Sequence, residues 1–153
     1  MQEQLFIVPG IIFLFIAIYW IIPNYWARNH CKTVIRTGNQ KSPYIALTFD
    51  DGPNPRYTPK LLDILKEHGV KASFFVVGKN AERYPHILHR IHSEGHVVGC
   101  HSYSHSHAWL LSPINTFRDL KRVCRVLEDQ LNNHPAWYRP PWGMFNLFTL
   151  PAA

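Results

Sequence analysis

The sequence predicts an α/β fold, a partial (β/α) barrel of about four β/α units that follows one N-terminal transmembrane helix. Short apolar runs of β-forming residues alternate with amphipathic helical stretches about every 25 residues. Such alternation is typical of parallel strands joined by crossover helices. Polar clusters follow three of the apolar runs, which is where folds of this class carry their chemistry.

The first apolar stretch, Leu5–Ile22, contains no charged residue. Its eighteen residues would span about 27 Å as a helix, enough to cross the hydrocarbon core of a membrane. Four aromatic residues would suit the membrane interface: Tyr19, Trp20, Tyr25 and Trp26. Residues 1–4 contain no Lys or Arg, and no small-residue cleavage site follows the span. We therefore expect an uncleaved anchor rather than a cleaved signal peptide or a buried core helix.

The predicted organisation is an anchor over 5–22, a linker over 23–41 and one domain over 42–153. The domain is long enough for a single hydrophobic core but not for two. Three basic residues follow the span (Arg28, Lys32 and Arg36), and the positive-inside rule would keep the domain in the cytoplasm. The function inferred below favours an extracytoplasmic domain on a single-pass protein, and we adopt that side despite the charge pattern.

Four strands and three helices are expected in the domain. The predicted strands cover 44–49, 70–77, 96–100 and 137–139. The predicted helices cover 58–68, 81–94 and 112–131, and Pro85 should interrupt the second. The third helix would turn one apolar face to the core, made of Ile114, Phe117, Leu120, Cys124, Leu127 and Leu131.

Charge and cysteine content narrow the function classes. The formal net charge is +6, but the basic residues are dispersed, so we expect no nucleic-acid partner. The three cysteines are odd in number and widely spaced, which fits neither a disulfide framework nor a CxxC zinc site. Cys100 and Cys124 are most simply small buried residues.

The first polar cluster, Thr48–Asn54, places two adjacent carboxylates where a strand ends. Asp50 and Asp51 can serve different partners, so that one binds a metal while the other acts as a base. Gly52-Pro53 would turn the chain there. A plain Asp-Gly-Pro turn is the alternative interpretation of this cluster alone.

The second cluster, His101–His105, follows the third strand. Two imidazoles four residues apart can converge on one ion if the loop is tightly turned. In a chain with ten histidines such a spacing also arises by chance, and nearby His107 could be mistaken for a ligand.

The third cluster, Arg139–Gly143, follows the fourth strand with the sequence RPPWG. Arg139 could hold a carboxylate, and Trp142 could form a wall for a sugar ring. The alternative is a proline-stiffened turn with an aromatic side chain on the surface.

Taken together, TFDDGP, HSYSH and RPPWG resemble the first three motifs of the NodB-like polysaccharide deacetylases, the family 4 carbohydrate esterases. The resemblance covers roughly 42–143 and implies a NodB-like deacetylase domain that hydrolyses N-acetyl groups on a cell-surface polysaccharide such as peptidoglycan or a chitin-like polymer. It implies Asp51, His101 and His105 as metal ligands, with zinc first and cobalt or another divalent ion as alternatives.

The resemblance also implies catalytic roles for Asp50, as general base, and for Arg139, which would orient it. Tyr103, Pro141 and Trp142 would contact substrate, and a backbone N–H near Tyr103 or Ser104 could assist the metal at the oxyanion.

The sequence departs from the family after Gly143. The family's later motifs, including a Leu-x-Leu-His strand with a general acid, have no counterpart in 144–153. We therefore expect an incomplete barrel whose activity is reduced or lost. Two alternatives remain: a non-catalytic, membrane-anchored metal- or carbohydrate-binding fragment, and a membrane protein with a basic tail that binds anionic lipid or nucleic acid.

Overall fold

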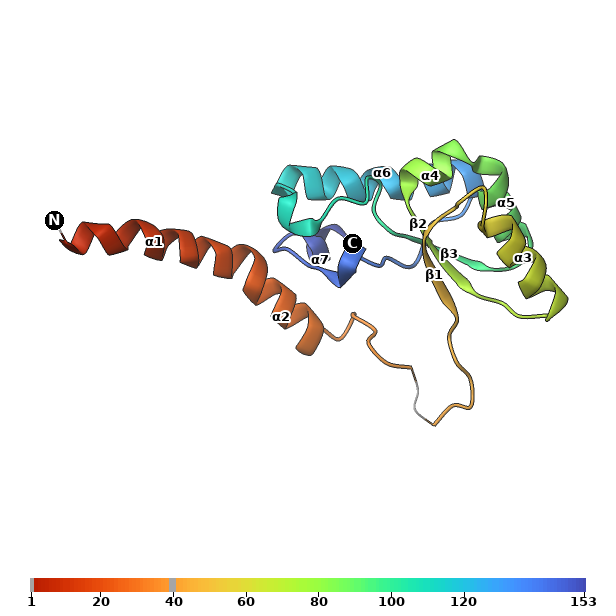
Figure 1. The fold of residues 1–153 in the computed structure, drawn as a ribbon, viewed down its shortest axis with the longest axis horizontal. Coiled ribbons are helices and arrows are strands. Elements are labelled where there is room, and N and C mark those ends of the chain that lie inside the picture. The colour runs from red at the N-terminus through yellow and green to blue at the C-terminus, as the bar shows by residue number, and fades with distance from the viewer. Residues whose placement is uncertain (1, 39–40) are drawn as a thin grey trace.

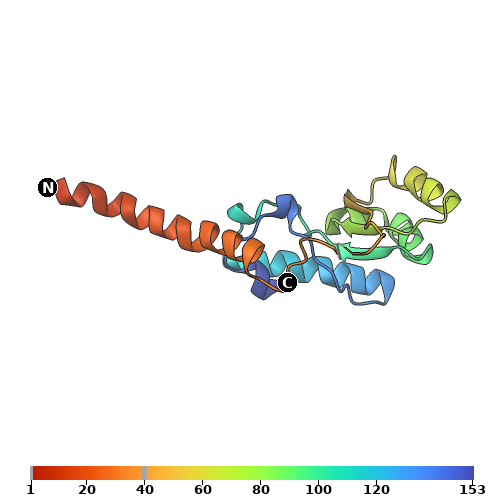
Figure 2. The same ribbon diagram turned by 90° about the horizontal axis from the view of Figure 1, so that it is seen from below.

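The computed structural model describes residues 2–38 and 41–153, and it combines a long N-terminal helix with an α/β domain (Figure 1). The helix consists of α1 (Gln2–Ile16), a π-helical turn (Ala17–Ile21) and α2 (Ile22–Asn29). It continues past Ile22, where we expected the linker to begin. In two perpendicular views α1 projects away from the domain (Figures 1 and 2).

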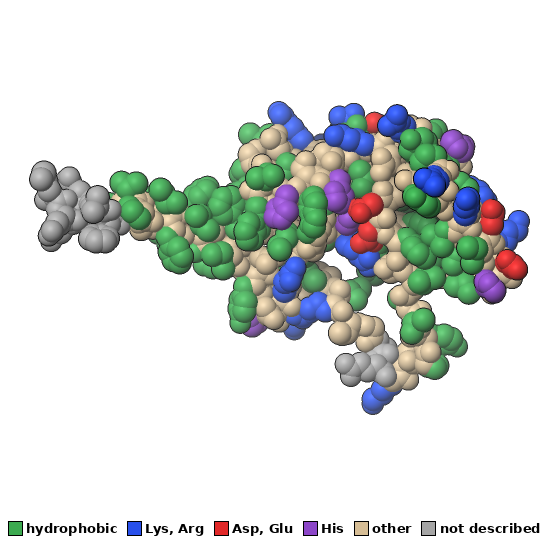
Figure 3. All heavy atoms as spheres, viewed as in Figure 1, with side chains coloured by type: hydrophobic (Ala, Val, Ile, Leu, Met, Phe, Trp, Pro, Cys, Tyr) green, Lys and Arg blue, Asp and Glu red, His purple; other side chains and the backbone are tan. Residues whose placement is uncertain are grey.

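Residues Ile7–Asn29 are long and apolar enough to cross a membrane, by length and composition. Most large apolar side chains from Ile7 to Ile18, Ile16 excepted, are about half exposed or more, and they cover the visible face of the projecting helix (Figure 3). A soluble core helix would bury such side chains, so their exposure agrees with a membrane anchor or a signal sequence.

The second half of this helix contacts the domain. The Tyr19 hydroxyl donates a 2.8 Å hydrogen bond to the carbonyl oxygen of Leu111, and the Leu147 N–H donates to the carbonyl oxygen of Tyr19 at 3.0 Å. Further along, Nη2 of Arg28 donates to the carbonyl oxygen of Gly143 at 2.8 Å. The helix is thus fixed to the domain at Leu111, Gly143 and Leu147.

The sheet contains β1 (Thr48–Gly52), β2 (Ser73–Val76) and β3 (Val97–Cys100) in the order β1-β2-β3. Both pairings are parallel, as predicted. The predicted first strand, 44–49, is displaced: the chain becomes a strand only at Thr48. Tyr44 and Ile45 are 86% and 93% exposed and lie outside the sheet.

The predicted fourth strand is reduced to one parallel bridge, between Cys100 and Tyr138. Two backbone hydrogen bonds support it: the Cys100 N–H donates to the carbonyl oxygen of Trp137, and the Arg139 N–H donates to that of Cys100. Only one side of this segment has a neighbour in the described part of the chain, so the ladder does not extend. Even so, the bridge places Arg139 at the same edge as the ends of β1 and β3.

The helices follow the predicted order. They are α3 (Thr58–Glu67), α4 (Gly78–Arg83), α5 (Pro85–Ser93), α6 (Pro113–Leu131) and a short α7 (Thr149–Ala152). Pro85 starts α5 and separates it from α4, as expected. Side chains from the sheet and helices form one core, which includes Leu62, Phe74, Val76, Leu88, Ile91, Val123 and Leu127.

The predicted apolar face of α6 is partly wrong. Ile114 and Phe117 are exposed, and the buried face instead contains Thr116, Asp119, Leu120, Val123, Val126 and Leu127. The first turns of α6 lie against a polar loop rather than against the sheet, so polar residues are buried there. The buried Asp119 is one of them, and it bears directly on the site.

Candidate metal centre

The end of β1 presents both of its carboxylates because the strand is irregular there. Asp50 pairs with Phe75 and Gly52 with Val76, which leaves Asp51 as an extra residue in the ladder. Asp51 has a φ of 68°, a left-handed conformation. Adjacent residues of a regular strand point to opposite faces, and an extra residue changes the direction of the side chain. The carbonyl oxygen of Asp51 accepts a 2.8 Å hydrogen bond from the Asn80 side-chain amide, which helps hold this conformation.

The loop after β3 is tightly turned rather than helical. Ser102 and His105 both have positive φ, 66° and 57°. The His105 N–H donates to the Ser102 hydroxyl at 2.8 Å, so this serine supports the loop. The turn brings the His105 ring to 5.3 Å from the His101 ring, centroid to centroid.

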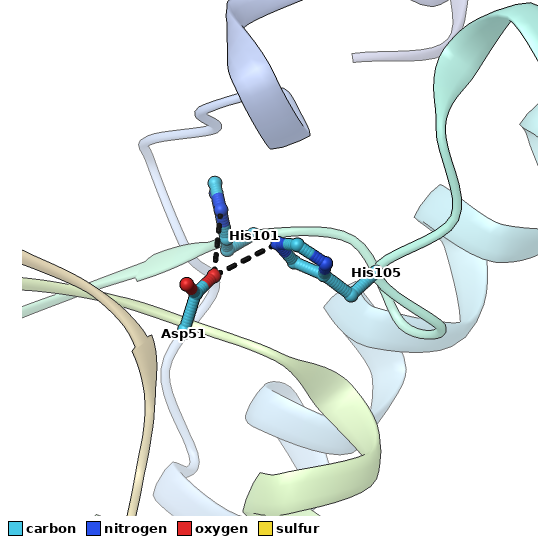
Figure 4. Close-up of side chains that lie close together, drawn as sticks. All are labelled: Asp51, His101 and His105. Carbon is cyan, nitrogen blue, oxygen red and sulfur yellow. Dashed lines mark ion pairs between the residues drawn. The ribbon is translucent and has the colours of Figure 1, made fainter.

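Asp51, His101 and His105 meet at one point (Figure 4). Oδ1 of Asp51 lies 3.2 Å from Nε2 of His101 and 2.8 Å from Nε2 of His105. One potential ligand atom from each of the three residues lies within 4.8 Å of the other two. Histidine and acidic side chains also lie side by side on the face seen in Figure 3. The structure therefore brings together all three residues expected as ligands.

The protonation of His101 indicates what these three groups can bind. Its Nδ1 lies 2.7 Å from the carbonyl oxygen of Arg139, which can only accept, so Nδ1 carries the proton and donates it. Burial lowers the pKa of His101 and favours the neutral ring, whose Nε2 then has a lone pair and no proton. Nε2 of this neutral ring lies 3.2 Å from the Asp51 carboxylate, an arrangement in which both atoms can be ligands of one cation. The donor set fits a divalent metal ion.

Arg139 binds Asp50, the second carboxylate of the site, which is not one of the three potential metal ligands. Its Nη1 donates to Oδ1 of Asp50 at 2.7 Å and to the Thr48 hydroxyl at 3.0 Å. The guanidinium carbon lies 4.0 Å from the centre of the Phe75 ring. Asp50 is therefore held next to the metal-binding group but bound to a different partner, which leaves its carboxylate available as a base.

Comparison with known proteins agrees with this geometry. The sequence model described as polysaccharide deacetylase matches residues 37–153. The chain belongs to the polysaccharide deacetylase family. The resemblance of the three motifs is thereby confirmed, and the match begins five residues before the domain that we predicted.

Individual deacetylases of the family show how far the similarity extends. A peptidoglycan-N-acetylglucosamine deacetylase of Bacillus cereus is 42% identical over 121 residues, which cover 79% of this chain and 43% of the relative. The peptidoglycan-N-acetylmuramic acid deacetylase PdaC of Bacillus subtilis is 42% identical over 108 residues, covering 71% of this chain and 23% of the relative. The chain thus spans less than half the length of these relatives.

A solved deacetylase-family structure supports the fold. The family 4 acetyl xylan esterase of Clostridium thermocellum, crystallised with a cobalt ion, superposes with a TM-score of 0.66 at 32% identity. The match covers 71% of this chain and 53% of that one. Members of the family thus carry metal, and the Asp51, His101 and His105 group is where this chain could hold one.

Asp119 organises the histidine loop of this deacetylase domain, and the sequence analysis did not identify it. Its carboxylate accepts hydrogen bonds from the Tyr103 N–H at 2.8 Å, the Ser104 N–H at 3.0 Å and the Ser104 hydroxyl at 2.6 Å. Both backbone N–H groups are therefore occupied by Asp119, so neither is free to assist at an oxyanion as we expected. The signal in the sequence was one acidic residue directly before Leu120, a residue of the predicted apolar face.

The expected substrate-binding residues of this deacetylase domain separate into two kinds. Tyr103 is buried, and its hydroxyl donates to Glu82 while its ring lies 3.7 Å from the Arg122 guanidinium carbon. Pro141 is also buried, so neither residue offers much surface to a glycan. Trp142, in contrast, is 56% exposed, with its ring centroid 4.5 Å from that of His105.

His107 lies outside the metal-binding group. Its Nδ1 accepts the Trp109 N–H at 3.2 Å, and its ring lies 5.2 Å from that of Trp142. This histidine therefore helps support the exposed tryptophan beside the metal-binding group.

Proposed function

We propose that this chain belongs to a metal-dependent enzyme that hydrolyses the N-acetyl groups of a cell-wall polysaccharide, with peptidoglycan or a related N-acetylglucosamine polymer as substrate. The observation that carries the proposal is the convergence of one carboxylate and two imidazoles, those of Asp51, His101 and His105, beside a second carboxylate held by Arg139. The names of the two Bacillus relatives support a peptidoglycan substrate.

Each group in the site has a distinct task. Asp51, His101 and His105 would hold the ion, which supplies Lewis acidity toward water and the acetyl carbonyl. Asp50 accepts the proton of the attacking water, and Arg139 holds the Asp50 carboxylate in position. Trp142 offers its exposed ring to a sugar, while buried Tyr103 and Pro141 support the loops behind it. Cleavage of the amide gives acetate and a free amino sugar.

Zinc is the metal that we propose for this site. Two imidazoles and one carboxylate make up the ligand set of many catalytic zinc centres, and they leave positions open for water and substrate. The same ligands accept cobalt and other divalent ions, so the metal that is loaded depends on supply as well as on affinity.

Metal content tests the first half of the proposal. The full chain, purified in detergent and stripped with a chelator, should take up one equivalent of zinc. Asp51→Asn and His105→Ala should each lose most of it, whereas the control His107→Ala should keep it, since His107 only supports Trp142 and Trp109. Equal zinc content in all four proteins would overturn the proposed ligand set.

Acetate release from N-acetylglucosamine oligomers and from peptidoglycan tests the second half. Release that requires zinc and is lost in Asp50→Asn supports the enzyme. Stoichiometric zinc without any acetate release would instead favour a metal- or carbohydrate-binding role for this chain.

We also propose that the N-terminal helix anchors the domain to a membrane, on the extracytoplasmic side. The exposed apolar face of α1 and the cell-wall substrates named for the relatives support this location. Alkaline carbonate extraction should leave the intact chain in the membrane, and protease added to whole cells with a permeable wall should digest the domain. A mature N-terminus after residue 22 would identify a cleaved signal peptide instead.

A further inference from the structure

Two cysteines lie in contact behind the metal-binding group. Cys100 is the last residue of β3, and Cys124 lies on α6, which packs against that strand. Their sulfur atoms are 3.7 Å apart and unbonded. Cys31 is remote from this pair, since its sulfur contacts the Thr33 hydroxyl after the N-terminal helix.

The two thiols differ in access and in reactivity. Cys100 is 2% exposed, while Cys124 is partly exposed. The hydrogen bond from the Cys100 S–H to the Cys124 sulfur lowers the pKa of Cys124 to about 7. A thiolate is the nucleophile in disulfide exchange, so Cys124 is the thiol that an oxidant can reach and react with first.

We propose that Cys100 and Cys124 form an intramolecular disulfide by exchange with a disulfide oxidant, and that this bond fixes the metal-binding loop to α6. The two sulfurs need to approach by less than 2 Å to reach a bonding distance of about 2.05 Å. This inference uses the thiol pair alone and stands independently of the proposed deacetylase activity.

The exchange has two balanced steps. The Cys124 thiolate attacks one sulfur of the oxidant, which breaks the oxidant's disulfide, forms a mixed disulfide on Cys124 and releases one thiolate. Cys100 then loses its proton to that thiolate and attacks the Cys124 sulfur, which forms the Cys100–Cys124 bond and releases the second thiolate. Two electrons pass from the cysteine pair to the oxidant, which leaves as two thiols.

The disulfide would close a loop of the chain that contains two of the proposed metal ligands. The chain between the two cysteines contains His101, His105 and Asp119. Closing this loop reduces the conformational freedom of the unfolded chain, so the oxidised protein should unfold at a higher temperature, by roughly 5–10 °C.

Peptide mapping tests the pair directly. The folded full chain in detergent, carrying Cys31→Ser to remove the third thiol, would be treated with oxidised glutathione at neutral pH. Trypsin cuts after Arg118, Lys121 and Arg122, so Cys100 and Cys124 fall in different peptides. We expect these two peptides linked by a disulfide under non-reducing conditions, and a higher Tm that reverts on reduction.

Two further variants identify the order of the steps. With Cys100→Ser the reaction should stop at a glutathione adduct on Cys124, and with Cys124→Ser the buried Cys100 should stay unmodified. The proposal is overturned if both thiols stay free in the folded protein while the urea-unfolded chain oxidises. A glutathione adduct that persists on Cys124 with Cys100 present, or a Tm lowered by the linkage, would equally overturn it.

Discussion

Arg139 and Asp50 form an ion pair in which Nη1 of the arginine lies 2.7 Å from Oδ1 of the aspartate. The carbonyl oxygen of the same arginine accepts the proton of His101 Nδ1 at 2.7 Å. One residue thus positions the proposed base through its side chain and a proposed metal ligand through its backbone. A substitution at Arg139 removes the side-chain contact with Asp50 but keeps the backbone contact with His101, so it can separate the two effects.

Arg139→Met should lower kcat by about 10²-fold, because Asp50 loses the partner that holds it in place. Zinc content should stay unchanged, because the backbone carbonyl that fixes His101 remains. Arg139→Lys should give an intermediate kcat, since lysine keeps the charge but cannot donate from a planar fork over Phe75. Steady-state kinetics and metal analysis of the same preparations check this.

The matched control for Arg139 is Arg118→Met, which removes one exposed arginine from α6. It should leave both kcat and zinc content as they are. A loss of zinc in Arg139→Met would show that the side chain, and not only the carbonyl, supports the metal group.

Asp119→Asn should weaken zinc binding by about 10- to 100-fold, the range found when outer-shell partners of metal ligands are removed. The amide keeps one acceptor oxygen but turns an N–H₂ toward the N–H groups of Tyr103 and Ser104, which also donate. The histidine loop should therefore lose its fixed conformation. Competition with a chromophoric zinc chelator measures the affinity.

Asp129→Asn is the control on the same helix, since Asp129 is exposed. It should bind zinc as the unsubstituted chain does. If Asp119→Asn also kept its zinc affinity, the three hydrogen bonds would have no role in shaping the loop.

The main residues of the site could be predicted because each lies next to the end of a strand, and the apolar runs in the sequence indicate where those strands end. Asp51 and His101 follow apolar runs, and parallel strands bring their ends to one edge. The three motifs, each ambiguous alone, became specific when they fell in order along such runs. Parallel pairing followed from the alternation of strands and helices, the break at Pro85 from the proline itself, and the set of three ligands from the family resemblance.

The supporting residues could not be predicted in the same way, because their roles depend on packing between distant segments. Asp119 reaches its partners from a helix whose buried face includes polar groups. Tyr103 turns inward only because α4 lies against its loop: a Cβ added at Gly78 would meet Tyr103 Cδ2 at 2.6 Å. β1 begins at Thr48 rather than at residue 44, because Tyr44 and Ile45 are exposed and do not join the sheet. The local composition of this segment does not indicate that exposure.

His96 should make the fold less stable in mild acid. Burial lowers the pKa of its imidazole, with Lys71 acting in the same direction and Glu94 opposing. Between the lowered and the ordinary pKa, His96 is therefore protonated in the unfolded chain but neutral in the folded chain. Stability should fall as the pH drops below the ordinary histidine pKa of about 6.5, until the lowered pKa of the folded state is reached.

His96→Asn should reduce this loss of stability, because an amide does not titrate while its oxygen can still accept the Ala72 N–H that now binds Nδ1. Urea unfolding in detergent at pH 7.5 and pH 5.5, with metal removed, gives the two free energies of unfolding. Their difference should be smaller in His96→Asn than in His92→Asn, an exposed neighbour on α5. Equal differences in the two variants would assign the acid sensitivity to other groups.

Trp142→Ala should raise KM for N-acetylglucosamine oligomers by about 2- to 10-fold, with a smaller change in kcat, because the exposed ring contributes binding rather than chemistry. Trp142→Phe should recover part of this loss, since it keeps an aromatic face beside His105. Trp137→Ala is the control, because that half-exposed side chain lines a separate cavity with His96 and Leu131. An equal rise in KM for both alanine variants would mean that the glycan does not lie on Trp142, and a fall in kcat alone would mean that the indole positions His105 instead.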